Sequence, residues 1–400
     1  MLEPPVIDID PYSREVIPDP YPFHERLRET APVVRIARHG IYATGRFDEV
    51  ATVIQDYDRF MVSAGIGIAD NRKPGSWRQP GGILEHDPPA HTQLRSALGR
   101  ILSPAVLRSW QERFVRGAKE IVDRAIDLSR GGGEVDGVDD VAEAFVMTVF
   151  PPALGVEIRR DYAVALGNMN FNQIGPYNDL VIESMKLCEP MMEWYEASIQ
   201  REAMVPGGFG EAIYAAMDRG DIPPGSAPAQ VRQFLRGGFD TTIAGIGFTL
   251  NQLARAPDQW DMVRADPAGG SRAAFEEAIR HESPSIGNAR TVVEETVLSG
   301  YRLEKDVKIV TFIGAANRDP RRWEAPDRFD MTRKVLGRHI AFGMGVHKCI
   351  GQMIARAEAE AVLSELARRV ARIELAGEPR YRLLNSLRTL DSLPLRLIPA

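Results

Sequence analysis

The sequence has very little cysteine and no long apolar run. Only Cys188 and Cys349 occur among its 400 residues, too few for a disulfide framework, and a reducing compartment would keep both as thiols. No apolar stretch approaches the roughly 20 residues that span a bilayer, so we expect no membrane partner. Residues 1–22 are acidic and proline-rich and lack the basic start and apolar stretch of a secretory signal. These absences predict a cytoplasmic protein.

Positive charge is also in deficit. The 49 Lys and Arg residues are outnumbered by 55 Asp and Glu, which gives a net charge of −6 and no bulk attraction for nucleic acid, so we expect no nucleic-acid partner. Hydrophobic residues make up 44% and charged residues 26% of the chain, as in ordinary globular proteins. No repeat, low-complexity tract or polar linker divides it. We therefore predict one domain over residues 1–400.

The residue pattern predicts mostly helix with a minor sheet. An N-terminal part, 1–75, contains a short helix and two short strands that meet in a tight turn at His39 and Gly40. A helical part, 87–256, includes a helix that Ser103 and Pro104 open, and one long apolar helix over 228–256. The remaining part, 257–400, contains short strands, a glycine-rich loop and a long final helix over 351–375.

The segment "AFGMGVHKCIGQ", residues 341–352, places a cysteine among glycines just before that final helix. Three interpretations of Cys349 remain open from the residues alone: an ordinary buried thiol, a zinc ligand, or the single thiolate ligand of a haem. The glycines let the backbone pass close to a flat surface, and the start of the helix should lower the thiol pKa. Zinc would want three or four ligands at a recognisable spacing, and only His347 is near.

The same segment resembles the cysteine-ligand signature of the cytochrome P-450 superfamily. The positions that match are Phe342, Gly343, Gly345, His347, Cys349 and Gly351. The resemblance extends over essentially the whole chain, including "DPYPFHERLRETAPVVR" near the N-terminus, and implies the superfamily's fold, a single triangular prism of helices with small β-sheets. It also implies haem b, with Cys349 as the axial thiolate, as the cofactor of a monooxygenase that uses O2.

The resemblance assigns further positions to haem binding and folding. It implies that His91 and Arg95, in "HDPPAHTQLR", bind one haem propionate and that Arg290 and His347 bind the other. Three more cofactor contacts follow from the signature loop itself, at Phe342, Gly343 and Gly351. In "FEEAIR", Glu277 and Arg280 look like the family's buried structural pair, although E-x-x-R spacing alone is weak because it recurs elsewhere in the chain.

"GGFDTT" is the expected site of oxygen chemistry. From the residues alone, Asp240 and Thr241 form either a helix cap or a functional pair deep in an apolar stretch, where an unpaired acid would be costly. The resemblance implies that Gly237 and Gly238 make room for O2 and substrate, and that Asp240 and Thr241 deliver the protons that oxygen activation needs.

Four segments resemble the bacterial branch that oxidises para-substituted benzoates, notably by O-demethylation: "SWRQPGGILEHDPPAHTQLR", "NFNQIGPYNDL", "VPGGFG" and "ANRDPRRW". The expected substrate contacts that match are Arg78, Phe171 and Arg232, with Gln233 as a polar group on the long helix; those that depart from the branch are Gly81, Ile174, Arg236, Asn288 and Ala289. Arg236 either binds the carboxylate of an aromatic acid or pairs with Asp240. Because Ile174, Asn288 and Ala289 stand where the branch has aromatic residues, the pocket should be larger than in that branch.

The chain contains no flavin-binding domain and no cysteine cluster for an iron–sulfur centre, so electrons from NAD(P)H must arrive through separate proteins. The family expectation is a ferredoxin and its reductase, for which Lys348 and Arg356 offer a basic docking patch. Alternative substrates are phenols, terpenoids or natural-product intermediates. Rival classes are a peroxide-using or non-redox thiolate haem enzyme, a haem-based sensor or ligand-binding protein, and a zinc-binding structural protein.

Overall fold

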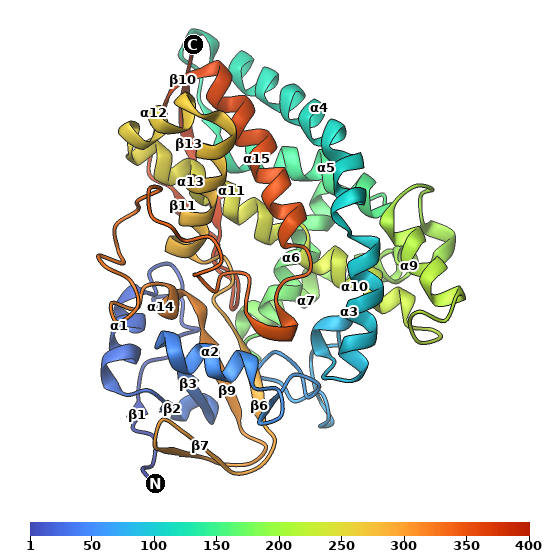
Figure 1. Cartoon of the computed structure of the whole chain (residues 1–400), viewed down its shortest axis with the longest axis vertical. Coiled ribbons are helices and arrows are strands. Elements are labelled where there is room, and N and C mark those ends of the chain that lie inside the picture. The colour runs from blue at the N-terminus through green and yellow to red at the C-terminus, as the bar shows by residue number, and fades with distance from the viewer.

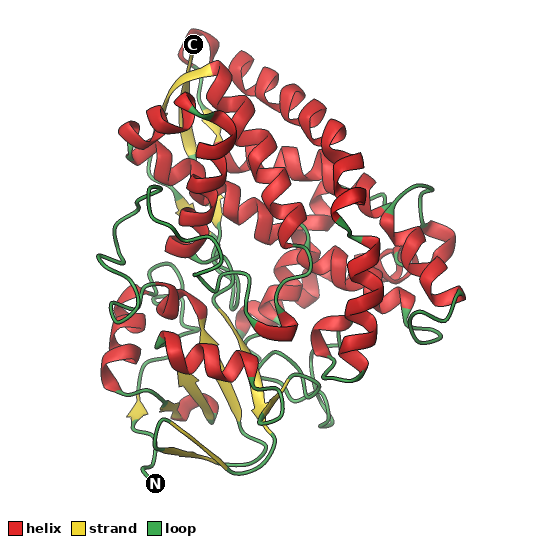
Figure 2. Ribbon diagram, in the orientation of Figure 1, coloured by secondary structure: helices red, strands yellow, loops and turns green.

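A mixed six-stranded sheet forms one end of the molecule, and a larger body of helices forms the rest (Figure 1, Figure 2). The computed structural model describes residues 1–400. The strand order is β1 (Val6–Ile7), β2 (Val34–Ile36), β3 (Ile41–Thr44), β9 (Lys308–Phe312), β6 (Gly287–Val292) and β4 (Phe60–Met61). β9 runs parallel to β3 and antiparallel to β6. The sheet thus joins the N-terminal segment to a part of the chain about 250 residues later.

The tight turn between β2 and β3 is formed as predicted. A short 3-10 turn, Ala37–His39, is followed by Gly40 at φ 62°, a left-handed conformation that favours glycine. β2 and β3 then pair antiparallel, with Val34 opposite Ala43.

Helices account for most of the remaining chain, which confirms a mainly α fold with minor β structure. Their bounds are α1 (Tyr21–Thr30), α2 (Phe47–Gln55), α3 (Ala90–Ile101), α4 (Pro104–Ser129), α5 (Ala144–Leu154), α6 (Arg160–Asn172), α7 (Asp179–Cys188), α8 (Met192–Ser198), α9 (Phe209–Asp218), α10 (Ala227–Gly237), α11 (Asp240–Arg255), α12 (Pro257–Ala265), α13 (Pro267–Glu282), α14 (Ile313–Asn317) and α15 (Gln352–Arg369). The small sheets are β10 (Val370–Leu375) with β13 (Pro394–Pro399) and β5 (Val135–Asp136), β11 (Arg380–Tyr381) with β12 (Leu390–Ser392), and β7 (Thr296–Leu298) with β8 (Tyr301–Leu303). No helix combines the length and the apolar character needed to cross a membrane.

The main core lies between the long helices α4, α11, α13 and α15 (Figure 1). Phe114 on α4, Phe248 on α11 and Leu363 on α15 are fully buried there, and each such side chain contributes about 1.5–3 kcal/mol of burial free energy. This packing fixes α15, and therefore the cysteine loop that immediately precedes it.

Two predicted helices differ from the structure. The helix predicted over 228–256 is interrupted between α10 and α11, which leaves residues 238–239 outside both helices. Gly238 packs so closely on Phe150 there that a Cβ would lie 2.0 Å from the ring. The final helix ends at Arg369, and residues 370–375 form β10, where Ile373 pairs with Leu397 of β13. Sheet pairing has here overridden the helical pattern.

Candidate active site

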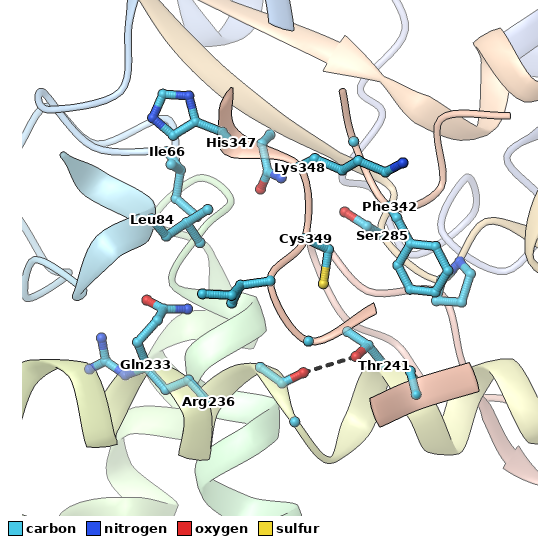
Figure 3. Close-up of a pocket in the computed structure, with 18 of the residues that line it drawn as sticks. Ile66, Leu84, Gln233, Arg236, Thr241, Ser285, Phe342, His347, Lys348 and Cys349 are labelled. Carbon is cyan, nitrogen blue, oxygen red and sulfur yellow. Dashed lines mark hydrogen bonds between the residues drawn. The ribbon is translucent and has the colours of Figure 1, made fainter. Parts of the chain in front are cut away.

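A large cavity lies between the cysteine loop, the α10–α11 junction and the sheet end of the molecule (Figure 3). Its empty space is about 1720 Å³, the open mouth included. The residues predicted from the sequence that line it are Arg78, His91, Arg95, Phe171, Ile174, Gln233, Arg236, Gly237, Gly238, Thr241, Asn288, Arg290, Phe342, Gly343, His347, Cys349 and Gly351. Segments far apart in the sequence therefore meet around one space.

The Cys349 thiol projects into this cavity toward Thr241 (Figure 3). Its backbone N–H donates to the Phe342 carbonyl at 2.8 Å, and Gly343 turns the loop at φ 70°. Burial raises the pKa of the thiol, and the amides of Gly351 and Gln352 act in the opposite direction. We expected a lowered pKa from the helix start; in the protein alone, the desolvation of the thiolate outweighs it.

Nothing around Cys349 resembles a zinc site. No group of three or more His, Cys, Asp or Glu side chains is arranged to hold a metal ion anywhere in the structure. The zinc interpretation therefore has no geometric support.

Two buried or half-buried cations and two histidines line the cavity beside the cysteine loop. Arg290 donates only to the adjacent Ala289 carbonyl, at 3.0 Å, and burial lowers its pKa to about 10. Arg95 donates to the Lys348 carbonyl. Neither guanidinium forms an ion pair with a carboxylate. Such a pair is suited to a ligand that carries two anionic groups.

Two histidines, His91 and His347, line the same part of the cavity as Arg95 and Arg290. The rings of His91 and His347 lie 4.3 Å apart, and burial lowers the pKa of both, that of His91 to about 4. The His347 Nε2 contacts the His86 carbonyl at 2.9 Å, whereas Nδ1 of each ring is buried without a hydrogen-bond partner. Unsatisfied buried nitrogens of this kind leave room for a ligand oxygen.

The predicted structural pair is present and fully buried. Arg280 donates to both carboxylate oxygens of Glu277 at 2.7 Å, within α13. Arg280 also donates to the carbonyls of Asn317 and Pro326, both at 2.9 Å, and Glu277 accepts from the Asp330 amide at 3.0 Å. The pair ties α13 to the segment that leads into the cysteine loop.

The α10–α11 junction faces Cys349 across the cavity. The Thr241 hydroxyl donates to the Gly237 carbonyl at 2.9 Å (Figure 3). A Cβ on Gly237 would meet open space, with only Gln233 Nε2 at 3.9 Å, whereas Gly238 is needed for contact with Phe150. Gly237 is thus the glycine that leaves space in the cavity.

Asp240 lies on the other side of the junction, outside the cavity lining. It faces Gly167 of α6, where a Cβ would clash with its carboxylate. Burial raises its pKa to about 7; Arg382 opposes this shift and Glu143 adds to it. An acid with a pKa near neutrality is suited to proton transfer.

Two buried arginines, Arg78 and Arg236, also line the cavity, and Arg236 lies at the end away from Phe342 (Figure 3). Arg78 Nε lies 3.3 Å from Glu85 Oε1, and its Nη1 has no partner. Arg236 donates from Nε to the Tyr195 hydroxyl at 3.1 Å and from Nη1 to the Gln79 carbonyl at 3.4 Å. Arg236 therefore makes no contact with Asp240, and of the two roles that the sequence left open for it, the pair with Asp240 is not formed.

Three predicted substrate contacts lie outside the cavity lining. Arg232 is held by Glu196, at 2.7 Å, and by the Gln79 side chain. Gly81 allows the Gln233 side chain to approach the backbone closely, since a Cβ at this position would lie 2.5 Å from Gln233 Oε1. Ala289 packs instead into the core of the N-terminal sheet. Each therefore acts at most indirectly on a ligand.

Sequence reasoning missed several of the lining residues. They include Ile66, Ile83, Leu84, Asn170, Phe234 and Thr242. The signal for Asn170 and Phe234 was their adjacency to the predicted residues Phe171 and Gln233. The apolar positions had no signal, because apolar side chains in the core and in a pocket look alike in a sequence.

The comparisons with known proteins agree with this site. The family profile described as Cytochrome P450 matches residues 271–370. The chain is 43% identical to Cytochrome p450 CYP199A2 of Rhodopseudomonas palustris over 99% of this chain and 95% of that protein. It is 31% identical to Cytochrome P450 107B1 of Saccharopolyspora erythraea, over 93% and 94%. The structure of Cytochrome P450 CYP109Q5 from Chondromyces apiculatus superposes with a TM-score of 0.81 at 28% identity, over 98% and 99%.

The chain belongs to the cytochrome P450 family and is a monooxygenase of that family. Family membership implies a haem with a cysteine thiolate ligand. The residues present fit this group: Cys349 supplies the only thiol in the cavity, Arg95 and Arg290 match two propionates, and the unpartnered nitrogens of His91 and His347 lie beside them. When bound, the haem supplies the oxidising chemistry, and the protein supplies its position, the protons and the shape of the pocket.

Proposed function

We propose that this monooxygenase oxidises a small aromatic carboxylic acid, with O-demethylation of a methoxylated benzoate as its reaction. The methyl carbon is hydroxylated with one oxygen atom of O2, two electrons and two protons, and the other oxygen atom leaves as water. The resulting hemiacetal releases formaldehyde and leaves a hydroxylated acid. The sequence resemblance to the benzoate-oxidising branch supports this class of substrate.

The observation that carries the proposal is the charge at the substrate end of the cavity. With Arg95 and Arg290 assigned to the haem propionates, Arg78 and Arg236 remain as buried cations in the lining. Glu85 is the only carboxylate paired with either of them. One positive charge is therefore uncompensated, which is costly in a buried site unless a ligand supplies an anion.

Arg78 is the residue to which we assign the substrate carboxylate. Its side chain is only 2% exposed, and its free Nη1 gives it donors that no protein group uses. Arg236 adds a second cation at the same end. Phe171 and Ile174 supply apolar contacts for a ring, and Gly237 leaves the space in which the methoxy group would face Cys349.

Proton delivery is assigned to the α10–α11 junction. Thr241 presents a hydroxyl to the cavity, and Asp240 behind it has a pKa near 7, which suits an acid that must take protons from solvent and pass them on. We further propose that a ferredoxin and its reductase bring the electrons of NAD(P)H. Arg356 is engaged by Glu276, so of the two basic residues predicted for docking, Lys348 is the one left free to contact a partner.

A ligand panel scored by the high-spin shift of the haem absorption tests this proposal. We expect 4-methoxybenzoate to give a large shift at low micromolar concentration, and its neutral isostere 4-methoxybenzamide to bind much more weakly. Tight responses only to uncharged ligands or to terpenoids such as linalool would overturn the assignment of an aromatic acid. They would instead favour the alternative substrate classes.

A further inference from the structure

Glu276 is a buried carboxylate whose partners all lie around the cysteine loop. It precedes Glu277 on α13, and its side chain is 6% exposed. His339 Nε2 contacts its Oε2 at 2.8 Å. Arg356 on α15 donates to both of its oxygens, with Nη2 at 3.2 Å from Oε2. Burial alone would raise the pKa of Glu276, but the hydrogen bonds from His339 and Arg356 lower it, so the group is an anion.

The histidine is fixed in one tautomer by its backbone contact. The Ala341 N–H donates to His339 Nδ1 at 3.1 Å, so Nδ1 is an acceptor and Nε2 carries the proton that is donated to Glu276. The adjacent Ile340 N–H donates to the Asn317 side chain at 2.9 Å. The segment that enters the cysteine loop is thereby held at two consecutive positions.

The arginine reaches the loop through an aromatic ring. The Arg356 guanidinium lies 4.5 Å from the centre of the Phe342 ring, a cation–π distance. Phe342 lines the cavity next to Cys349, and its carbonyl accepts the Cys349 N–H. One carboxylate on α13 thus holds a positive charge and an aromatic ring against the residue that ligates the iron.

We propose that Glu276 is a positioning residue that sets the reduction potential of the haem iron by fixing Arg356 against Phe342 and the cysteine loop. A positive charge near the thiolate favours the ferrous state, which carries one more electron, and the Glu276 carboxylate partly offsets that charge. The position of Arg356 and the net charge of Arg356 and Glu276 together therefore contribute separately to the reduction potential, and so to the electron transfer that starts turnover.

The two charge contributions predict shifts of opposite sign. Glu276→Gln keeps an acceptor for Arg356 but removes the negative charge, so the midpoint potential should rise. Arg356→Met removes the positive charge, so the potential should fall, and Arg356→Lys, which keeps the charge, should lie closer to the wild type. The measurement is spectroelectrochemical titration of the substrate-free holoenzyme, with the ferrous–CO spectrum recorded to verify thiolate ligation.

Glu360→Gln is the matched control. Glu360 on α15 pairs with Arg272 on α13 at 3.6 Å, so it joins the same two helices and loses the same charge, but at the surface and away from Phe342; its potential should equal that of the wild type. The proposal is overturned if Glu276→Gln and Arg356→Met shift the potential in the same direction, or if neither differs from Glu360→Gln. If Glu276→Gln does not fold with haem, the midpoint potentials of Arg356→Met and Arg356→Lys are compared instead. A purely structural role of Arg356 predicts equal shifts of potential in the two variants, whereas a role of its charge predicts a larger shift in Arg356→Met.

Discussion

The two sides of the cavity differ in how their polar groups are satisfied. On the cysteine side, Glu276 and Glu277 each have several protein partners, and the loop between Phe342 and Cys349 is closed by a backbone hydrogen bond. On the opposite side, buried polar atoms lack partners. They are Arg78 Nη1, Asn170 Oδ1 and Gln233 Oε1. The networks around Glu276 and Glu277 are complete within the protein, although the Nδ1 atoms of His91 and His347 beside the loop lack partners, whereas the opposite side is complete only with a ligand.

This difference between the two sides separates the geometry of the cysteine loop, which the family has in common, from the groups that select the substrate of this chain. The networks on the cysteine side hold Cys349 in one geometry whatever the substrate is. The unpaired groups on the opposite side cost stability until a matching ligand satisfies them, so they carry the information about the substrate. Substitutions on the two sides should therefore have different signatures.

The largest effect is expected from Cys349→Ala. Removal of the thiolate should abolish the thiolate-type Soret band of the ferrous–CO complex and reduce product formation to background, because no other thiol lines the cavity. Absorption spectroscopy of the reconstituted protein measures this. Cys188→Ala is the control, since that buried thiol is not part of the cavity lining. A thiolate-type band that survives in Cys349→Ala would contradict the assignment.

Next in size is the loss of the buried structural pair. Glu277→Gln leaves Arg280 buried without its charge partner and should lower the free energy of unfolding by about 3–5 kcal/mol, with loss of haem retention. Urea unfolding followed by both circular dichroism and Soret absorption measures the two effects. Glu365→Gln, which breaks partly exposed contacts with Arg368 and Arg369, should cost less than about 1 kcal/mol. Equal losses in the two variants would count against a special role of the Glu277–Arg280 pair.

On the opposite side, Arg78→Gln should weaken the binding of an aromatic acid, and because it leaves the buried Glu85 without its charge partner, it should also lower the free energy of unfolding. Loss of a charged hydrogen-bond donor to the substrate costs about 1.5–3 kcal/mol, roughly 10- to 150-fold in the dissociation constant of an aromatic acid. Binding of the neutral amide should be nearly unchanged. Arg236→Gln should give the same pattern with a smaller loss. Arg232→Gln serves as the comparison, because its guanidinium is already held by Glu196; spin-state titrations that showed equal losses for acid and amide would exclude a charge-based contact.

The smallest and most gradual effect concerns pH. The pKa of Asp240 is about 7 in the folded protein and near 4 when unfolded, so the folded state binds more protons between these values and the free energy of unfolding falls as the pH rises through this range. Asp240→Asn should remove this decrease in the free energy of unfolding, so the stability of the variant relative to the wild type should be greater at pH 8 than at pH 5. Wild-type turnover should fall as Asp240 deprotonates above pH 7, and the variant should be slow and less dependent on pH. Parallel pH profiles of the two proteins would contradict a proton-delivery role.

The cysteine side was largely predictable from the sequence, for a physical reason. Its glycines, Cys349 and the following helix are contiguous, so local backbone geometry brings them together. The pair Glu277–Arg280 is also local, one helical turn apart. By contrast, the contact between Arg236 and Tyr195 and that between Glu276 and Arg356 join residues 41 and 80 positions apart, and no local pattern encodes such pairings.

The opposite side was predicted less well for the same reason. Thr241 and Arg78 do line the cavity, but the direction of the Asp240 side chain depends on Gly167 of another helix, and the contact that holds Arg232 depends on Glu196. The interruption between α10 and α11 likewise follows from tertiary contact with Phe150. The helical periodicity of the segment gives no sign of that contact.

The most direct test of the proposed substrate class is product analysis in a reconstituted system. The purified holoenzyme is supplied with ferredoxin, its reductase and NADH, and its turnover of 4-methoxybenzoate is compared with that of 4-methoxybenzamide. We predict one formaldehyde and one 4-hydroxybenzoate for each acid consumed, at a rate far above that of the amide. Oxidation of the amide as fast as the acid, or no formaldehyde from the acid, would contradict a pocket whose unpaired positive charge selects an aromatic acid.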